Sequence, residues 1–207
     1  MTRDRIIVVT GTDTDVGKTV FAAGLAAVTG ASYWKPIQAG LEAGGDSASV
    51  QALGVRRVLP EAYRLTTPCS PHRAAALDGI RIDVERLALP PVAGPLVVEG
   101  AGGVLVPVDG DLLYADLLAR WGAQTVLVAR TALGTINHSL LSLEALRARG
   151  VPILGIAFVG PEMPDSEQTI ARLGRVRRLG RLPWLDPLDA ASLAAAFRQG
   201  FDVEAFK

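Results

Sequence analysis

The residues from Gly11 to Thr19 read Gly-Thr-Asp-Thr-Asp-Val-Gly-Lys-Thr, which is the composition of a phosphate-binding loop. Glycines let the backbone curl until successive N–H groups face one anion, and a helix that starts there adds positive potential. Lys18 can reach the β- and γ-phosphates of a nucleotide, and the Thr19 hydroxyl can ligate Mg²⁺. Five residues separate Gly11 from Gly17, one more than in the common motif. The segment predicts nucleoside triphosphate binding.

Two acidic residues and a second lysine carry side chains that could complete such a site. Glu99 follows an apolar run, and a carboxylate at the carboxyl end of a parallel strand lies on the ligand side of its sheet. Asp46 follows a glycine-rich loop and could either complete a magnesium shell or only cap a helix. Lys35 could place a second cation beside the γ-phosphate, or it could be a solvated surface charge.

These residues need a scaffold in which several strand ends meet. Apolar runs predict strands over 6–10, 32–35, 63–65, 95–99, 125–129, 153–159 and 179–182. Helical spacing predicts helices over 19–28, 46–53, 112–121, 137–149, 166–178 and 189–198. A flexible loop is expected over 40–45, and the prolines within 56–91 favour short helices and loops. The alternation predicts an α/β fold of the P-loop NTPase type, with a mostly parallel sheet and helices on both faces, forming one domain over 1–207.

Composition narrows the classes of function. The 207 residues include 21 basic and 21 acidic side chains, so the formal net charge of zero argues against capture of nucleic acid or of an anionic membrane. Cys69 is the single cysteine, which favours a reducing compartment. The apolar runs fall well below the roughly 20 residues of a membrane-spanning helix, and the N-terminal residues lack the features of a signal peptide. We expect a cytoplasmic protein.

Several segments, in order along the chain, resemble dethiobiotin synthetases. Residues 11–19 resemble the modified P-loop of that family, including its extra residue, and Trp34-Lys35-Pro36-Ile37-Gln38-Ala39-Gly40 resembles its lysine–proline loop. Four further segments are similar to family signatures: Pro68-Cys69-Ser70-Pro71-His72, Val98-Glu99-Gly100-Ala101-Gly102-Gly103, Leu133-Gly134-Thr135-Ile136-Asn137-His138 and Leu182-Pro183-Trp184-Leu185. The matches extend over nearly the whole chain.

The resemblance implies a reaction and its partners. One amine of 7,8-diaminononanoate takes up CO2 (or bicarbonate-derived CO2), and the resulting carbamate attacks the γ-phosphate of ATP. The second amine then attacks the carbamic–phosphoric anhydride and closes a cyclic urea, a late step of biotin biosynthesis. ATP is the implied co-substrate and Mg²⁺ the implied cofactor. The family is a homodimer with its substrate site at the subunit interface, and the resemblance implies neither a nucleic acid nor a membrane partner.

The resemblance also implies roles for individual residues. Lys18 and Lys35 would act as catalytic cations, and Thr19, Asp46 and Glu99 would hold Mg²⁺. The implied nucleotide-binding residues are Asp15, Val16, Gly17, Lys18, Thr19, Val20, Asp46, Glu99, Gly100, Ala101, Gly102, Leu182, Pro183 and Trp184. The implied substrate-binding residues are Asp15, Lys35, Ala39 and, acting on the substrate of the other subunit, Asn137.

Two positions depart from the family pattern. Ala39 stands where the family usually has a Ser or Thr hydroxyl near the substrate, and Gln38 could compensate for that lost hydrogen bond. Many members have an Asn that reads adenine after the strand over 153–159, where this chain has Val159-Gly160-Pro161, so we expect weaker base selectivity and use of other nucleoside triphosphates.

Three alternatives stay open at this point. An amidoligase-type ATPase of the same class would carry a glutaminase domain with a nucleophilic Cys, for which the chain is short. A nucleotide switch that binds DNA or a protein partner would carry a basic face or a second signature lysine early in the P-loop. A homologue without activity would explain Ala39 and Val159, although the chain retains the lysines and carboxylates described above.

Overall fold

The computed structural model describes residues 6–41 and 44–206, so residues 42–43 of the expected loop lie outside the described residues. Its main sheet has seven strands, all parallel, in the order β4-β2-β6-β1-β7-β8-β9. The strands are β1 (Ile6–Gly11), β2 (Ser32–Trp34), β4 (Val58–Leu59), β6 (Leu96–Gly103), β7 (Gln124–Arg130), β8 (Ile153–Val159) and β9 (Arg178–Leu182). The expected α/β fold with a parallel sheet is confirmed.

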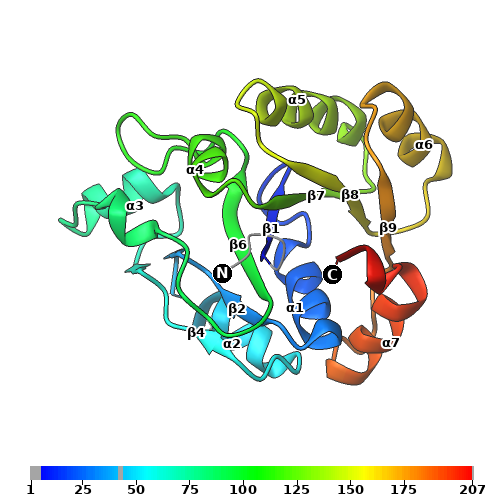
Figure 1. Ribbon diagram of the computed structural model, residues 1–207, viewed down its shortest axis with the longest axis horizontal. Helices are drawn as coiled ribbons and strands as arrows, with labels where there is room; N and C mark the ends of the chain where they lie inside the picture. The colour runs from blue at the N-terminus through cyan, green and yellow to red at the C-terminus, as the bar shows by residue number, and fades with distance from the viewer. Residues whose placement is uncertain (1–5, 42–43, 207) are drawn as a thin grey trace.

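Helices cover both faces of this sheet (Figure 1). One face carries α1 (Lys18–Thr29), α2 (Gly45–Ala52) and α7 (Ala190–Gly200); the other carries α4 (Tyr114–Trp121), α5 (Thr135–Arg147) and α6 (Pro164–Leu173). Neighbouring residues of β1 point to opposite faces, so Val8 packs with the α4–α6 core and Val9 with the α1–α7 core. Both faces of the strands are therefore buried, which explains their continuous apolar runs.

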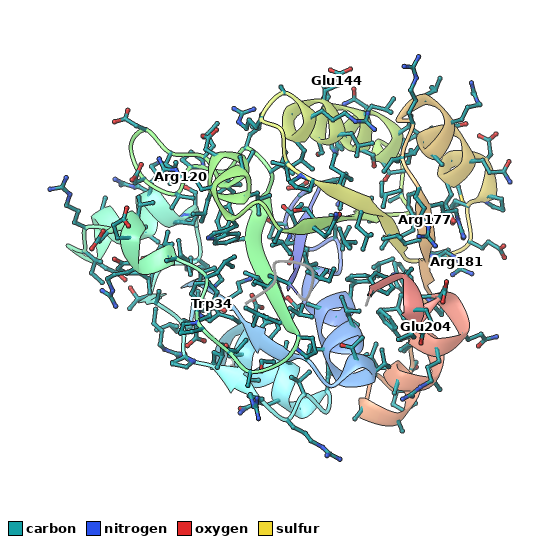
Figure 2. The ribbon with its side chains drawn as sticks, viewed as in Figure 1. Trp34, Arg120, Glu144, Arg177, Arg181 and Glu204 are labelled. Atoms are coloured by element: carbon teal, nitrogen blue, oxygen red, sulfur yellow. The ribbon has the colours of Figure 1, made fainter. Side chains whose placement is uncertain are left out.

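An aromatic cluster fixes the helix that follows the phosphate-binding loop. Phe21 on α1 lies with its ring centroid 5.3 Å from those of Phe197 and Phe201, and the latter two rings stack at 4.5 Å. In Figure 2 Trp34 lies in the interior, whereas the exposed side chains of Arg120 and Glu144 lie on the outer sides of α4 and α5. The cluster anchors the first turns of α1, and thereby the loop, against α7 and the C-terminal turn η4 (Val203–Phe206).

A second, two-stranded parallel sheet lies beside the main one and was only half expected. It pairs β3 (Ile37–Ala39) with β5 (Tyr63–Leu65), of which β5 alone was predicted. The short helix α3 (Pro71–Leu77) packs on it, and η3 (Val84–Leu87) follows. Within the described ranges, no helix is both long and apolar enough to span a bilayer.

Three of the predicted boundaries that differ from the structure have a clear local cause. The strand expected to stop at Glu99 continues to Gly103, because the glycine-rich run pairs with β1 through Gly11. The helix expected over 166–178 ends at Leu173, where Gly174 caps it and frees Arg178 to begin β9. The helix expected over 137–149 begins earlier, at Thr135, directly after Gly134 in a left-handed conformation.

Candidate active site

The phosphate-binding loop joins β1 to α1 in the predicted place. Asp15 and Gly17 have positive φ angles, of 55° and 90°, so the backbone turns sharply before α1. No side chain caps the N-terminus of α1, which leaves its first N–H groups for an anion. The Lys18 ammonium donates to the carbonyl of Asp13 at 2.6 Å and so folds back along the loop. This local geometry suits a phosphate group.

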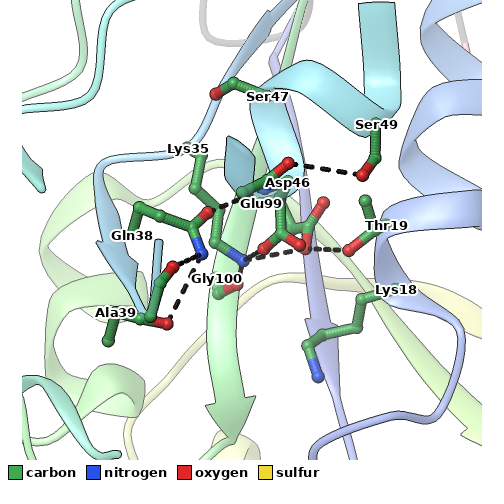
Figure 3. A network of polar contacts seen from close by, with 12 residues as sticks. Lys18, Thr19, Lys35, Gln38, Ala39, Asp46, Ser47, Ser49, Glu99 and Gly100 are labelled. Atoms are coloured by element: carbon green, nitrogen blue, oxygen red, sulfur yellow. Dashed lines mark hydrogen bonds and ion pairs between the residues drawn. The ribbon is translucent and has the colours of Figure 1, made fainter. Parts of the chain in front are cut away.

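Glu99 on β6 is the centre of a buried polar network that reaches β2 and the helices α1 and α2 (Figure 3). Its side chain has 0% exposure. Oε1 accepts from the Thr19 hydroxyl at 2.8 Å and from the Lys35 ammonium at 2.9 Å, while Oε2 accepts from the Tyr33 hydroxyl at 2.8 Å. Tyr33 is on β2, Lys35 directly follows β2, and Thr19 is in the first turn of α1. The three donors therefore meet near the carboxyl ends of the strands, where ligands of such sheets bind.

The Lys35 ammonium lies between the two predicted metal-binding carboxylates. It is 2.5 Å from Asp46 Oδ2 and 2.9 Å from Glu99 Oε1, and it also donates to the Gly100 carbonyl at 3.0 Å. Burial lowers the pKa of Lys35, but the attraction of Glu99 and Asp46 outweighs it and holds the pKa above its usual value. Lys35 is only 4% exposed, so its interpretation as a solvated surface charge is wrong.

Asp46 lies in the first turn of α2 rather than at its cap. Gly44 occupies the N-cap position and makes no side-chain cap hydrogen bond. The Asp46 carboxylate points instead to Lys35, as Figure 3 shows. The interpretation of Asp46 as only a helix cap is therefore wrong, and the residue belongs to the same cluster as Glu99.

The oxygen atoms of this cluster fit a magnesium ion. The Thr19 hydroxyl and the carboxylates of Asp46 and Glu99 gather around one positive charge, the Lys35 ammonium. Hard oxygen ligands are those that Mg²⁺ prefers, and it usually takes one or two carboxylates together with phosphate and water. Among the described residues, no group of three His, Cys, Asp or Glu side chains is arranged to hold a metal ion.

Lys18 differs from Lys35 in its electrostatic setting. Its side chain is 7% exposed, and Figure 3 shows its ammonium directed away from the Glu99 network. Burial lowers the pKa of Lys18 to about 8, because the attraction of Glu99 only partly offsets the loss of hydration and Lys35 adds repulsion. An anion bound beside Lys18 would raise this pKa and favour the charged form.

A cavity of about 640 Å³ opens beside the two lysines. The predicted site residues that line it are Asp15, Gly17, Lys18, Thr19, Val20, Lys35, Ala39, Asp46, Glu99, Ala101 and Gly102. The predicted site residues outside its lining are Val16, Gly100, Leu182, Pro183, Trp184 and Asn137. The segment from Pro68 to Pro71 also lines the cavity, so the cavity extends from the phosphate loop to the start of α3.

Gln38 is not free to replace the hydroxyl that Ala39 lacks. Its Nε2 donates to the Gly40 carbonyl at 2.9 Å, and its Oε1 accepts from the Asp46 N–H at 3.0 Å. Both ends of the amide therefore hold the loop that carries Asp46. Ala39 presents a methyl group to the cavity, and the missing hydrogen bond has no substitute from this neighbour.

The region expected to hold the base lies at the ends of β8 and β9. Val159 packs against the loop so tightly that a Cβ at Gly17 would come within 2.7 Å of its Cγ1. Arg181 donates to the Gly160 carbonyl at 2.9 Å, and the Gly160 N–H donates to the Leu182 carbonyl at 3.0 Å. Trp184 is 77% exposed next to this turn. Val159 and Gly160 offer no side-chain amide at this turn.

Tyr33 is the residue of this network that the sequence analysis missed. It is fully buried on β2, and its hydroxyl contacts Glu99. A tyrosine inside an otherwise apolar parallel strand needs a partner for its hydroxyl, and that requirement is the signal that could have found it.

Comparisons with known proteins find relatives over nearly the whole chain. A family model described as an AAA domain matches residues 5–192. The chain is 61% identical over 203 residues to the "ATP-dependent dethiobiotin synthetase BioD" of Rhodopseudomonas palustris (strain BisB18), covering 97% of each chain. It is 63% identical to the protein of the same name from Rhizorhabdus wittichii, covering 98% of each. The chain belongs to the dethiobiotin synthetase family.

Solved structures agree with the fold of this dethiobiotin synthetase family member. A ParA family ATPase from Chlorobium tepidum superposes with a TM-score of 0.51 at 12% identity, covering 98% of this chain and 95% of that one. A chain of the MinC:MinD cell division protein complex of Aquifex aeolicus gives a TM-score of 0.53 at 11% identity, covering 94% of each chain. At such identity the likeness concerns the P-loop NTPase fold alone. Family membership makes the chain an ATP-dependent ligase, and membership of this particular family speaks against the nucleotide-switch and amidoligase alternatives.

Proposed function

We propose that this chain forms dethiobiotin from 7,8-diaminononanoate, CO2 and ATP. The observation that carries the proposal is the convergence of Lys35, Asp46, Glu99 and Thr19 beside the phosphate loop in one cavity. The names of the relatives supply the product, and the cavity supplies room for a nucleotide's phosphates next to a second substrate.

The residues suit phosphoryl transfer to a carbamate. An amine of the substrate adds to CO2 and loses a proton, and a carbamate oxygen then attacks the γ-phosphorus as ADP leaves. Lys18 and Lys35 stabilise the negative charge that develops on the transferred group. The second amine attacks the carbonyl of the mixed anhydride, phosphate leaves, and the ring closes. Asp15, exposed at the mouth of the cavity, would attract and orient the cationic diamine.

Magnesium would be held by Thr19, Asp46 and Glu99 and would neutralise charge on the phosphate oxygens. Val159 offers no amide to the base, and the exposed indole of Trp184 beside Gly160 offers a stacking surface that every base can use. ATP is therefore the proposed co-substrate, and other nucleoside triphosphates are proposed to serve as well.

A homodimer is part of the proposal. Asn137 lies exposed in the first turn of α5, outside the cavity of its own subunit. Leu141 and Leu105 are 56% and 48% exposed and line one pocket beside α5, and Leu133, 101% exposed, lies two residues before that helix. Exposed apolar groups of this kind are typical of interfaces. We place Asn137 on the substrate carboxylate of the partner subunit. The proposal includes a cytoplasmic location and no nucleic acid or membrane partner, in keeping with zero net charge.

The test of the function is phosphate release from MgATP and bicarbonate, with and without 7,8-diaminononanoate, together with the mass of the product. We expect phosphate release that requires the diamine and matches the cyclic urea formed. Lys35→Met should abolish both, whereas Arg149→Met, which removes a partly exposed ion pair with Asp116, should leave them unchanged. Diamine-independent hydrolysis without urea would disprove the proposal.

Subunit mixing tests the role of Asn137. If Asn137 serves the partner's site, Lys35→Met and Asn137→Ala subunits are each inactive alone but share one intact site in each mixed dimer. Random exchange should therefore recover about a quarter of the wild-type activity. Mixed samples without recovery would place Asn137 outside the substrate site or show that the subunits do not pair in this way.

A further inference from the structure

The Tyr33 hydroxyl holds one particular oxygen of Glu99. It donates to Oε2 at 2.8 Å, while Oε1 takes the hydrogen bonds from Thr19 at 2.8 Å and from Lys35 at 2.9 Å. The two oxygens of one carboxylate thus face different surroundings. Oε2 lies toward the buried side of β2, and Oε1 faces the residues that surround the cavity.

The position of the Tyr33 ring is fixed, so its hydrogen bond to Glu99 can persist when ligands bind in the cavity. Its side chain is fully buried in the core formed with Val50 on α2 and Val97 on β6. Tyr33 also pairs through its backbone with Val97, two residues before Glu99, so both side chains are fixed by the same pair of strands. Thr19 and Lys35 face the cavity and can exchange partners, whereas Tyr33 does not line it.

We propose that Tyr33 is a positioning residue that holds Glu99 so that a single oxygen, Oε1, is presented to the cation site. The role rests on the proposed magnesium site of Thr19, Asp46 and Glu99. A glutamate free to turn can offer both oxygens to a large cation such as Ca²⁺, whereas Mg²⁺ requires compact octahedral ligation. By holding Oε2 elsewhere, Tyr33 favours the smaller ion. Residues that orient metal ligands in this way contribute strongly to affinity.

The test compares Tyr33→Phe with wild type by direct cation binding. Mn²⁺ binding in the presence of a non-hydrolysable ATP analogue is followed by electron paramagnetic resonance, and Ca²⁺ is titrated as a competitor. We expect Tyr33→Phe to bind Mn²⁺ about 10–100-fold more weakly. We also expect the ratio of Ca²⁺ to Mn²⁺ affinity to rise, a change that loss of stability alone would not produce.

Tyr63→Phe is the matched control. It also removes a hydroxyl from a buried tyrosine, one that accepts from the Asp83 N–H at 2.7 Å, and it lies outside the cavity lining. Its Mn²⁺ affinity and cation ratio should equal those of wild type. Equal losses in both variants, or wild-type cation binding by Tyr33→Phe, would overturn the role of Tyr33 while leaving the metal site in place.

A double variant tests whether Tyr33 acts through Glu99, separately from whether the proposed metal site exists. In Glu99→Gln protein, Tyr33→Phe should change the affinity for the metal–nucleotide complex by less than about twofold, because the positioned oxygen is already altered. A further tenfold loss there would show that Tyr33 does not act through Glu99. Absence of Mn²⁺ binding to nucleotide-loaded wild type would instead disprove the proposed metal site, and the role of Tyr33 with it.

Discussion

Lys35 and Glu99 are 64 residues apart in sequence, yet the ammonium of one lies 2.9 Å from the carboxylate of the other. The register of two parallel strands produces this contact. Trp34 at the end of β2 is aligned with Val98 on β6, so the next residue of each strand lies alongside the other. Both side chains are buried, and the pair is completed by Asp46 at 2.5 Å.

Lys35→Met should destabilise the ligand-free protein by about 3–5 kcal/mol, because it leaves the buried Glu99 carboxylate without its cationic partner. Mg²⁺ should then take over the missing charge. At a Mg²⁺ concentration about 100-fold above its Kd, binding should restore about 2.7 kcal/mol of the free energy of unfolding. Urea denaturation with and without MgCl2 measures both effects. Arg149→Met serves as the exposed ion-pair control and should cost at most about 1 kcal/mol. A loss of similar size in both variants, unaffected by Mg²⁺, would contradict this electrostatic interpretation.

Nucleotide affinity should fall as the pH rises through the pKa of Lys18, which is about 8 in the ligand-free protein. Above that pH the ammonium that meets the phosphates must first be reprotonated, which costs up to about tenfold in affinity per pH unit. Lys35 stays charged over this range because its pKa is raised. Fluorescent-nucleotide titrations from about pH 6 to pH 10 follow the change. Lys18→Arg keeps its charge and should give a flat profile; a flat wild-type profile would refute the prediction.

The same pKa sets the sign of a stability effect. The folded value of about 8 lies below the ordinary value of 10.5, so between them the unfolded chain binds the proton more readily. The contribution of Lys18 to the free energy of unfolding should therefore increase as the pH rises through this interval. Comparing the pH dependence of wild-type stability with that of Lys18→Met isolates it, and parallel curves for the two proteins would contradict the assignment.

Ala39→Ser should improve binding of the diamine. The side chain lines the cavity, and Gln38 is committed to Gly40 and Asp46, so a new hydroxyl would add a hydrogen bond that the cavity now lacks. A gain of about 1 kcal/mol corresponds to an approximately fivefold lower KM for the diamine, with kcat little changed. Steady-state kinetics test this, with Ala119→Ser on α4 as a control outside the cavity. An unchanged KM would mean that the substrate does not reach Ala39.

Val159→Asn should increase the preference for ATP over CTP and GTP. In the wild-type protein Val159 contributes packing against Gly17, and we expect the three triphosphates to differ by no more than about tenfold in kcat/KM. The amide of asparagine would supply the donor and acceptor that distinguish bases. Val159→Thr, which matches the valine in shape, is the control and should leave the ratio near that of wild type. Strong ATP preference in the wild type would disprove weak base selectivity.

The sequence by itself determined the features that depend on neighbouring residues. The loop from Gly11 to Thr19 is contiguous, so its strand–turn–helix context could be predicted from local composition, as could the alternation of strands and helices. The ends of strands could not be predicted where pairing with a neighbouring strand overrides the local conformational preference of the residues. β6 continues through Gly100 because β1 supplies its hydrogen bonds, and β3 exists because β5 lies beside it.

Only the tertiary structure decided how the charged residues are paired. Strand order and register bring Lys35, Asp46 and Glu99 together, commit Gln38 to its own loop, and give the Tyr33 hydroxyl its partner. The contacts of Glu99 with Lys35 and Tyr33 join residues 64 and 66 positions apart, and only the pairing of β2 with β6 brings them together. The residue types in the sequence indicated which chemistry the site could perform. The packing of the parallel strands determined which of their atoms are in contact.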